Sequence, residues 1–285
     1  MPALLCVHPH PDDESIACGG VIAQAVDAGY RVKVVTCTRG EEGENLAGID
    51  LGDEDLVTHR VRELADALDE LGVSDHEFLG YRDSGMVDTP GNAHPDSFHA
   101  ADLYEASARL ARTIRRFRPD VVVSDDANGT YGHPDHVKGH RVTERALAMA
   151  EDPWWHTPDD GEPHAVAKRY VFAFTRSAML STHRRLLAEG LASPFGEGDI
   201  DESDLVFGIP DEDVTTIVDI SPVLDRKRAA MRAHRSQIGE DSFFLNVPED
   251  LVVELFGTEA FVLLAGEVGA TPEEDLFAGL AGGTS

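Results

Sequence analysis

Basic residues are scarce in this chain. Its 285 residues include 24 lysines and arginines against 53 aspartates and glutamates, a formal net charge of −29 at pH 7. Phosphate groups are bound mainly through lysine and arginine, so this balance argues against nucleic acid or an anionic membrane as a partner. The acids are scattered along the chain, and we interpret them as a solvated surface.

Cysteine is also scarce. The three cysteines, Cys6, Cys18 and Cys37, cannot all pair within the chain, and no framework of spaced pairs is present. A reducing compartment is therefore expected. The chain also lacks a basic start followed by a long apolar region, and no run approaches the ~20 apolar residues that span a bilayer. We expect a soluble, cytoplasmic protein.

Strand-like and helix-like patterns alternate over the first 175 residues. Short apolar or β-branched runs predict strands at 3–8, 32–37, 76–81, 120–124 and 169–174, and the segments between them predict helices at 15–28, 56–71, 100–117 and 136–149. Strands separated by helices are typical of an α/β fold with a parallel sheet and helices on both faces. We predict a Rossmann-like, mostly parallel sheet as the core, residues 1–175.

Two clusters of histidine and carboxylate follow two of these strands. The run His-Pro-Asp-Asp-Glu at 10–14 comes after the first strand, and the run Gly-His-Pro-Asp-His at 132–136 comes after the fourth. In open parallel sheets, ligands bind outside the carboxyl ends of the strands, where loops distant in sequence converge. The two clusters therefore indicate one shared site.

The clusters contain the residue types that bind a catalytic metal ion. His10, Asp13 and His136 supply two imidazoles and one carboxylate, the set that binds Zn²⁺ with an open position for water. The same set suits non-haem Fe²⁺. Pro11 and Pro134 stiffen the two loops. We predict one Zn²⁺ per chain, with Fe²⁺ as the alternative.

Residues beside these ligands offer acid, base and hydrogen-bonding groups. A metal lowers the pKa of a bound water towards ~7, so a free carboxylate at Asp12 could accept its proton. His133 and Tyr131 could stabilise an oxyanion or protonate a leaving amine. Asp135 could orient an imidazole. Asp12, His133 and Tyr131 are the predicted catalytic residues.

Other classes of protein account for these residues less well than a hydrolase does. The acids at 12–14 could simply complement a helix N-terminus, a role that suits Glu14. A protein that only binds metal or sugar would need none of the three predicted catalytic groups. A ferrous oxygenase would need a co-substrate site that no sequence feature marks. A dinucleotide enzyme is disfavoured because no G-x-G-x-x-G follows the first strand.

After Phe174 the alternation is lost. Residues 193–213 predict a loop, 225–237 a charged helix and 260–265 a short strand, while 282–285 are expected to be disordered. We predict a smaller C-terminal subdomain, residues 176–285, that covers the active site. Candidates in it for reaching that site are Lys227, His234, Arg235 and Asn246.

The motifs resemble those of the LmbE-like, or GlcNAc-phosphatidylinositol de-N-acetylase, superfamily. The likeness rests on the two metal runs and on residues 36–44, 81–86, 128–137 and 275–280. It implies zinc held by His10, Asp13 and His136, with Asp12 as general base and with His133 and Tyr131 assisting.

The resemblance also implies substrate-binding residues. Arg60 and Asp83 would hold hydroxyl groups of the sugar or inositol, Met86 would line the pocket, and Glu44 would belong to the same binding set. An uncharged polyol needs such fixed donors and acceptors.

Within the superfamily, the chain looks closest to the branch that deacetylates N-acetylglucosaminyl inositol in mycothiol biosynthesis. The resemblance implies a zinc-dependent N-deacetylase that converts a small amino-sugar substrate to the free amine and acetate. A sister branch, the mycothiol S-conjugate amidase, tends to carry a lysine after the Asp-Asp-Glu-Ser run, and residues 16–20 contain none. The amidase, or a deacetylase of another N-acetyl sugar, stays open as an alternative. The oligomeric state stays open too.

Overall fold

The computed structural model describes residues 1–155, 161–269 and 272–280. At its centre lies a seven-stranded sheet in the order β3-β2-β1-β4-β5-β7-β6. Its strands are β1 (Ala3–His8), β2 (Arg31–Thr36), β3 (Asp75–Phe78), β4 (Val121–Ser124), β5 (Lys168–Ala173), β6 (Thr216–Asp219) and β7 (Thr258–Ala265). The first five strands are parallel, and β7 is antiparallel to both its neighbours. The predicted Rossmann-like, mostly parallel sheet is confirmed.

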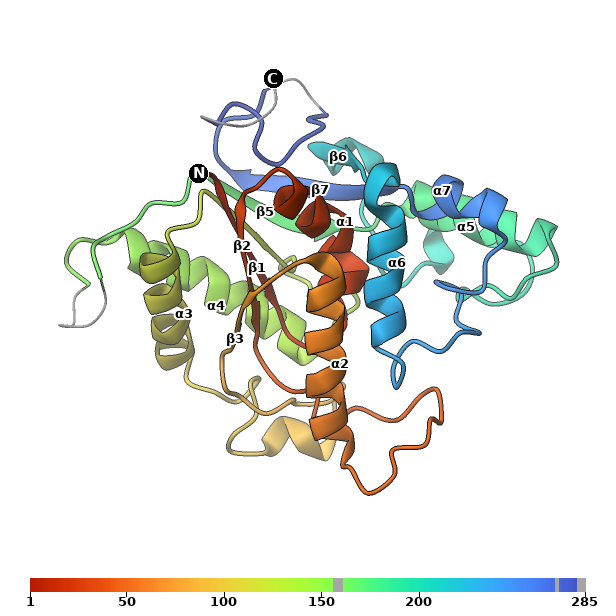
Figure 1. Ribbon diagram of the computed structural model, residues 1–285, viewed down its shortest axis with the longest axis horizontal. Coiled ribbons are helices and arrows are strands. Elements are labelled where there is room, and N and C mark those ends of the chain that lie inside the picture. The colour runs from red at the N-terminus through yellow and green to blue at the C-terminus, as the bar shows by residue number, and fades with distance from the viewer. Residues whose placement is uncertain (156–160, 270–271, 281–285) are drawn as a thin grey trace.

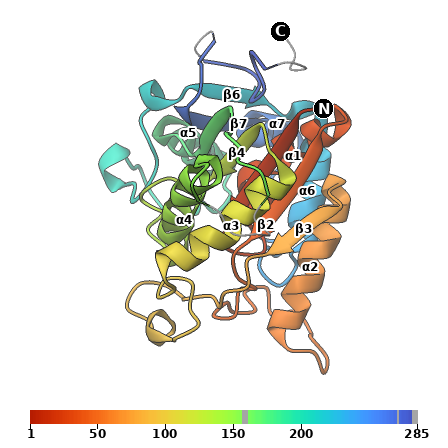
Figure 2. The same ribbon diagram turned by 90° about the vertical axis from the view of Figure 1, so that its left-hand side faces the viewer.

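Helices cover both faces of the sheet (Figures 1 and 2). They are α1 (Asp13–Asp27), α2 (Leu56–Leu71), α3 (Leu103–Phe117), α4 (Pro134–Glu151), α5 (Arg176–Ala188), α6 (Leu224–Ala233) and α7 (Glu249–Phe256). Helices α1, α2 and α6 pack over one apolar core, and α3 and α4 pack over a second core on the opposite face. The sheet is therefore buried on both sides, as its apolar central strands predict.

Local sequence explains why the best-predicted elements begin and end where they do. Every residue of β1 is buried, which suits its apolar run. Helix α2 begins after Asp55, whose side chain accepts the Thr58 N–H, and ends at Gly72 in a left-handed conformation with φ 78°. Its leucines at 64, 68 and 71 form one buried face. The bounds of β1 and α2 agree with the predicted ranges.

The C-terminal part of the chain continues the same sheet. Strands β7 and β6 extend it beyond β5, and α6 packs against α1 and α2. The proposed division at residue 175 thus separates two segments that share one sheet. The alternation-based prediction overlooked α5, β6 and α7, and residues 282–285 lie outside the described residues. Within the described ranges, no helix is long and apolar enough to cross a membrane.

Candidate active site

The two clusters meet at the carboxyl edge of the sheet. Strands β1 and β4 are neighbours at the centre of the sheet, and the connections that leave them lead to helices on opposite faces, α1 and α4. Such switch points are where ligands bind in α/β sheets. The loop after β1 carries His10 and leads to Asp13, the first residue of α1, and the segment after β4 leads to His136 at the start of α4. Asp13 Oδ2 lies 3.5 Å from His10 Nδ1 and 3.6 Å from His136 Nε2. The structure thus brings these three side chains together at one edge of the sheet.

His136 is oriented by a carboxylate that the sequence did not single out. Its Nδ1 lies 2.5 Å from Asp125 Oδ1, and both side chains are almost fully buried. Its Nε2 is buried, faces Asp13 and has no hydrogen-bond partner among the described residues. Two atoms that bind one ion at ~2.0–2.2 Å stand about 3.3 Å apart, close to the spacing seen here. The orphaned nitrogen therefore fits a metal ligand.

His10 shows the same division of its two nitrogens. Nε2 lies 3.4 Å from Asp135 Oδ2 and 3.5 Å from Asp83 Oδ1, while Nδ1 faces Asp13. A carboxylate on one nitrogen, with the other directed at the ion, is the usual environment of a metal-binding imidazole. Burial alone would raise the pKa of Asp13, but the imidazoles of His136 and His10 outweigh it and hold that pKa well below its usual range. The residues present fit a divalent cation.

His133 lies among these imidazoles, with its ring 4.6 Å from that of His10. His10, His133 and His136 each offer a nitrogen within 4.8 Å of the others, so His133 is a rival ligand on distance alone. However, the Asp135 N–H donates to His133 Nδ1 at the start of α4. A neutral His133 therefore carries its proton on Nε2 and acts there as a donor. Burial, with the neighbouring His10 and His136, lowers its pKa to about 4, which keeps the ring neutral.

Asp12 has an unusual backbone conformation, and its carboxylate is both largely buried and in contact with Arg60. Its φ is 122° and its ψ −31°, at the residue before α1. Arg60 Nη2 lies 3.4 Å from Asp12 Oδ2 and also donates to the Pro11 carbonyl, while Nη1 donates to the Gly40 carbonyl. Burial raises the pKa of Asp12 to about 6, against the opposing effect of Arg60. A carboxyl group tuned in this direction suits a proton acceptor.

The other predicted residues surround this centre at different depths. Asp83 is 4% exposed, contacts His10 and accepts the Gly85 N–H. Arg60 is equally buried, whereas Glu44, Met86 and Tyr131 are exposed, and the Tyr131 ring lies 5.1 Å from that of His136. Arg60 and Asp83 thus hold the segments around Asp12 and His10 in place, and their contacts with substrate stay predictions.

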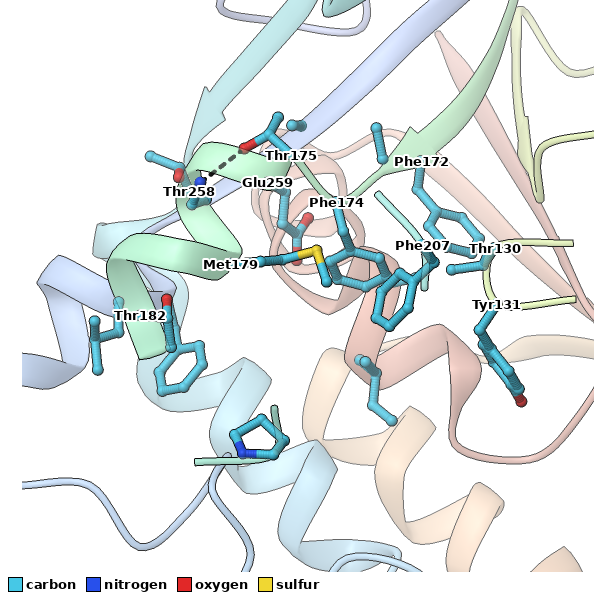
Figure 3. Close-up of a pocket in the computed structure, with 18 of the residues that line it drawn as sticks. Thr130, Tyr131, Phe172, Phe174, Thr175, Met179, Thr182, Phe207, Thr258 and Glu259 are labelled. Carbon is cyan, nitrogen blue, oxygen red and sulfur yellow. Dashed lines mark hydrogen bonds between the residues drawn. The ribbon is translucent and has the colours of Figure 1, made fainter. Parts of the chain in front are cut away.

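A cleft of about 930 Å³ opens beside the polar centre. Asp12, Asp13, Tyr131 and His136 line one end, and its remaining wall is largely apolar. Figure 3 shows Phe172, Phe174 and Phe207 between Tyr131 and Met179. The Phe174 ring lies 6.0 Å from that of Phe172 and 6.1 Å from that of Phe207. Sequence reasoning missed this wall because its aromatic residues come from separate segments and follow no motif.

Two of the C-terminal candidates, His234 and Lys227, pair with buried carboxylates near the centre. His234 Nε2 lies 2.7 Å from Glu14 Oε1, with both side chains fully buried, and Glu14 Oε2 accepts the Asp12 N–H. Lys227 Nζ lies 2.6 Å from Glu259. Glu14 therefore does more than complement a helix N-terminus, because it ties the Asp12 loop to the end of α6.

An α/β sheet with imidazoles, carboxylates and a hydrogen-bond donor at its switch point is the constellation of a metal-assisted hydrolase. Residues 5–147 match the family PIG-L: GlcNAc-PI de-N-acetylase. The chain belongs to this family, and the predicted resemblance is confirmed.

Several relatives align with nearly the whole chain. The chain is 45% identical to the 1D-myo-inositol 2-acetamido-2-deoxy-alpha-D-glucopyranoside deacetylase of Geodermatophilus obscurus, covering 98% of each chain. It is 44% identical to the protein of that name in Acidothermus cellulolyticus, covering 98% of this chain and 95% of the relative. Among solved structures, a conserved protein of Thermus thermophilus superposes with a TM-score of 0.59 at 25% identity, covering 95% of this chain and 98% of that one.

Proposed function

We propose that this chain is a metal-dependent N-deacetylase that hydrolyses the acetamide of N-acetylglucosaminyl inositol to the free amine and acetate. The observation that carries the proposal is the convergence of His10, Asp13 and His136 beside the carboxylate of Asp12. The names of the full-length relatives support this substrate.

We propose Zn²⁺ at the site, held by His10, Asp13 and His136. The same donors suit Fe²⁺. When bound, the ion would acidify a water molecule and polarise the acetamide carbonyl. Asp125 and Asp135 would fix the ring orientations of the two histidines through their outer nitrogens.

The remaining steps belong to side chains. Asp12, held by Arg60, would accept the proton of the attacking water. His133 would donate its Nε2 proton in a hydrogen bond to the carbonyl oxygen as that oxygen gains negative charge. Tyr131, at the cleft wall, would donate to the same oxygen. As the C–N bond breaks, the protonated Asp12 would return its proton to the leaving nitrogen.

Substrate recognition would come from residues around this centre. We propose that Arg60 and Asp83 hold sugar or inositol hydroxyls, with Met86 and Glu44 at the exposed side of the site. The scarcity of basic residues suits such an uncharged polyol. A cytoplasmic location is part of the proposal, because the three cysteines are free thiols.

The test is amine release from N-acetylglucosaminyl inositol by Zn²⁺-loaded protein, measured before and after removal of metal by a chelator. Turnover that disappears with the metal and returns on its replacement is expected. His136→Ala should remove both metal and activity. His164→Ala is the matched control, because His164 bonds the Pro119 carbonyl in another part of the fold. Full activity in His136→Ala would overturn the site.

The apolar cleft favours including a second substrate in the same assay. Phe172, Phe174 and Phe207 could accommodate an apolar group attached to the sugar, as in a mycothiol S-conjugate. Cleavage of the conjugate without cleavage of N-acetylglucosaminyl inositol would assign the amidase activity instead. Inactivity on both, with metal bound, would direct the search to other N-acetyl sugars.

A further inference from the structure

A second group of metal-ligating side chains lies behind the active site. Cys6 and His8 are alternate residues of β1 and so share one face of the strand, the face that α1 covers. Cys18 projects from α1 towards them. The two sulfur atoms and one ring nitrogen lie within 4.8 Å of one another. All three side chains are fully buried.

His8 is the member that apolar packing does not explain. Buried cysteines often act as small hydrophobic residues, but an imidazole needs hydrogen-bond partners when it leaves water. Neither Nδ1 nor Nε2 of His8 forms a hydrogen bond of good geometry in the described part of the chain, and its polar neighbour is the weakly hydrogen-bonding sulfur of Cys6. Leaving such a buried polar group unsatisfied has a cost in folding stability. A cation that accepts a nitrogen lone pair would remove that cost.

We infer that Cys6, His8 and Cys18 form a binding site for a thiophilic divalent cation such as Zn²⁺ or Cd²⁺. Ligands at ~2.0–2.3 Å from one ion stand about 3.5–4 Å apart, so from separations of at most 4.8 Å a contraction of no more than about 1.3 Å completes the site. Two thiolates are the soft ligands that such ions prefer, with the imidazole as third.

The charges favour a divalent ion over a monovalent one. Each thiol releases one proton as its sulfur binds, so the ion displaces two protons and the complex of two thiolates with M²⁺ is neutral. A neutral complex is the least costly one in a site shielded from water. Glu259 is not needed for neutrality, because its carboxylate already accepts from the Gly20 and Val21 N–H groups and from Lys227.

This site is separate from the catalytic centre in composition and position. The proposed catalytic ligands include no sulfur, whereas the second site has two sulfur ligands. The His8 ring lies 5.9 Å from the ring of Phe172, a residue of the cleft wall. Binding there would join α1 to β1, the two elements on either side of the loop that carries His10 and Asp12. Metal binding at this site would therefore stabilise the packing of α1 on β1 without taking part in catalysis.

The experiment is a Cd²⁺ titration of chelator-stripped protein, followed by thiolate-to-cadmium charge-transfer absorption and by native mass spectrometry. Wild type should show the band and take up a second equivalent of Cd²⁺ beyond the catalytic one. Cys6→Ser and Cys18→Ser should each lose the band and that equivalent. Cys37→Ser is the matched control, because Cys37 is equally buried but packs in the core on the other face.

Two further variants keep the result interpretable. His136→Ala should lose only the catalytic equivalent and keep the band, which separates this inference from the proposed function. His8→Gln should weaken Cd²⁺ binding at least tenfold while retaining the thiolates. Circular dichroism of each metal-free variant reports its folding, and Cys18→Ser carries the test if Cys6→Ser does not fold. Absence of the band in folded wild type, or its loss only in Cys37→Ser, would overturn the site.

Discussion

His136 and Asp125 form a buried pair, with 2.5 Å between Nδ1 and Oδ1, that leaves the other imidazole nitrogen facing Asp13. The pair fixes both the tautomer and the ring orientation of a proposed metal ligand. A residue that never touches the ion thus determines how well His136 can bind it.

Replacing that carboxylate should weaken metal binding without removing the ligands. Asp125→Asn is expected to reduce Zn²⁺ affinity about 10–100-fold, since the imidazole loses its charged partner. Competition with a chromogenic chelator measures the affinity, and kcat at saturating Zn²⁺ should recover in large part. Asp126→Asn is the neighbouring control, because its Oδ1 accepts loop N–H groups at Asn128 and Thr130. Equal affinity in Asp125→Asn and wild type would contradict the role assigned to the pair.

Asp12 should be needed for turnover and dispensable for the metal. Asp12→Asn keeps the size of the side chain and removes its ability to accept a proton, so kcat should fall about 10²–10⁴-fold. Metal content by elemental analysis should stay near that of wild type. Simultaneous loss of metal would identify Asp12 as a ligand.

His133 separates two possible ligand sets. His133→Asn retains a side chain that can cap α4 but removes the Nε2 donor, so kcat should fall about 10²–10³-fold with Zn²⁺ retained. The number of bound Zn²⁺ ions, measured by native mass spectrometry, and kcat, measured by steady-state kinetics, distinguish the two ligand sets. Should the ion be lost with kcat, His10, His133 and His136 would be the true ligands.

Tyr131 should act on the reaction more than on binding. Tyr131→Phe retains the ring beside His136 and removes the hydroxyl, so kcat should fall about tenfold or more while KM changes little. The opposite pattern, a raised KM at constant kcat, would make Tyr131 a substrate-binding residue.

The buried ion pair between Lys168 and Glu273, away from the proposed active site, should make the folding stability depend on pH in the acid range. Glu273 bonds Lys168, the Gly269 N–H and the Tyr170 hydroxyl. Burial alone would raise the pKa of Glu273, but these partners outweigh it and lower that pKa. The folded state therefore gains stability above the ordinary glutamate pKa of about 4.3, and the gain is lost as the pH falls through the lowered value.

Glu273→Gln should accordingly destabilise the protein by about 3–5 kcal/mol at pH 7, because Lys168 is left as a buried, unpaired charge. The difference from wild type should shrink when urea unfolding is repeated well below pH 4. Glu274→Gln, at the exposed neighbouring position, should change little at either pH. A deficit in Glu273→Gln that does not depend on pH would show that the ionised carboxylate contributes nothing.

The sequence predicted what depends on local pattern. The apolar run of β1 and the leucine face and capping residues of α2 gave the observed bounds, and the two histidine runs identified residues that meet at one sheet edge. Strand β6 was overlooked because its four residues gain their pairing from β7, an interaction between distant segments.

The rest of the site depends on three-dimensional packing. Asp125 follows β4 without a motif of its own, and only the turn into α4 brings it to His136. The partner of Glu14 is His234, 220 residues away. No pattern of spacing predicts such pairs, and the apolar cleft likewise arises from aromatic residues on separate segments.

The backbone of Asp12 has a consequence for the evolution and engineering of this protein. A φ of 122° is a conformation that glycine adopts readily and that costs other residues of the order of 1–3 kcal/mol. Screening variants by melting temperature alone would therefore enrich glycine at position 12, whereas screening by turnover would restore aspartate. The role proposed for Asp12 as proton acceptor would therefore be gained at the expense of stability in the loop after β1.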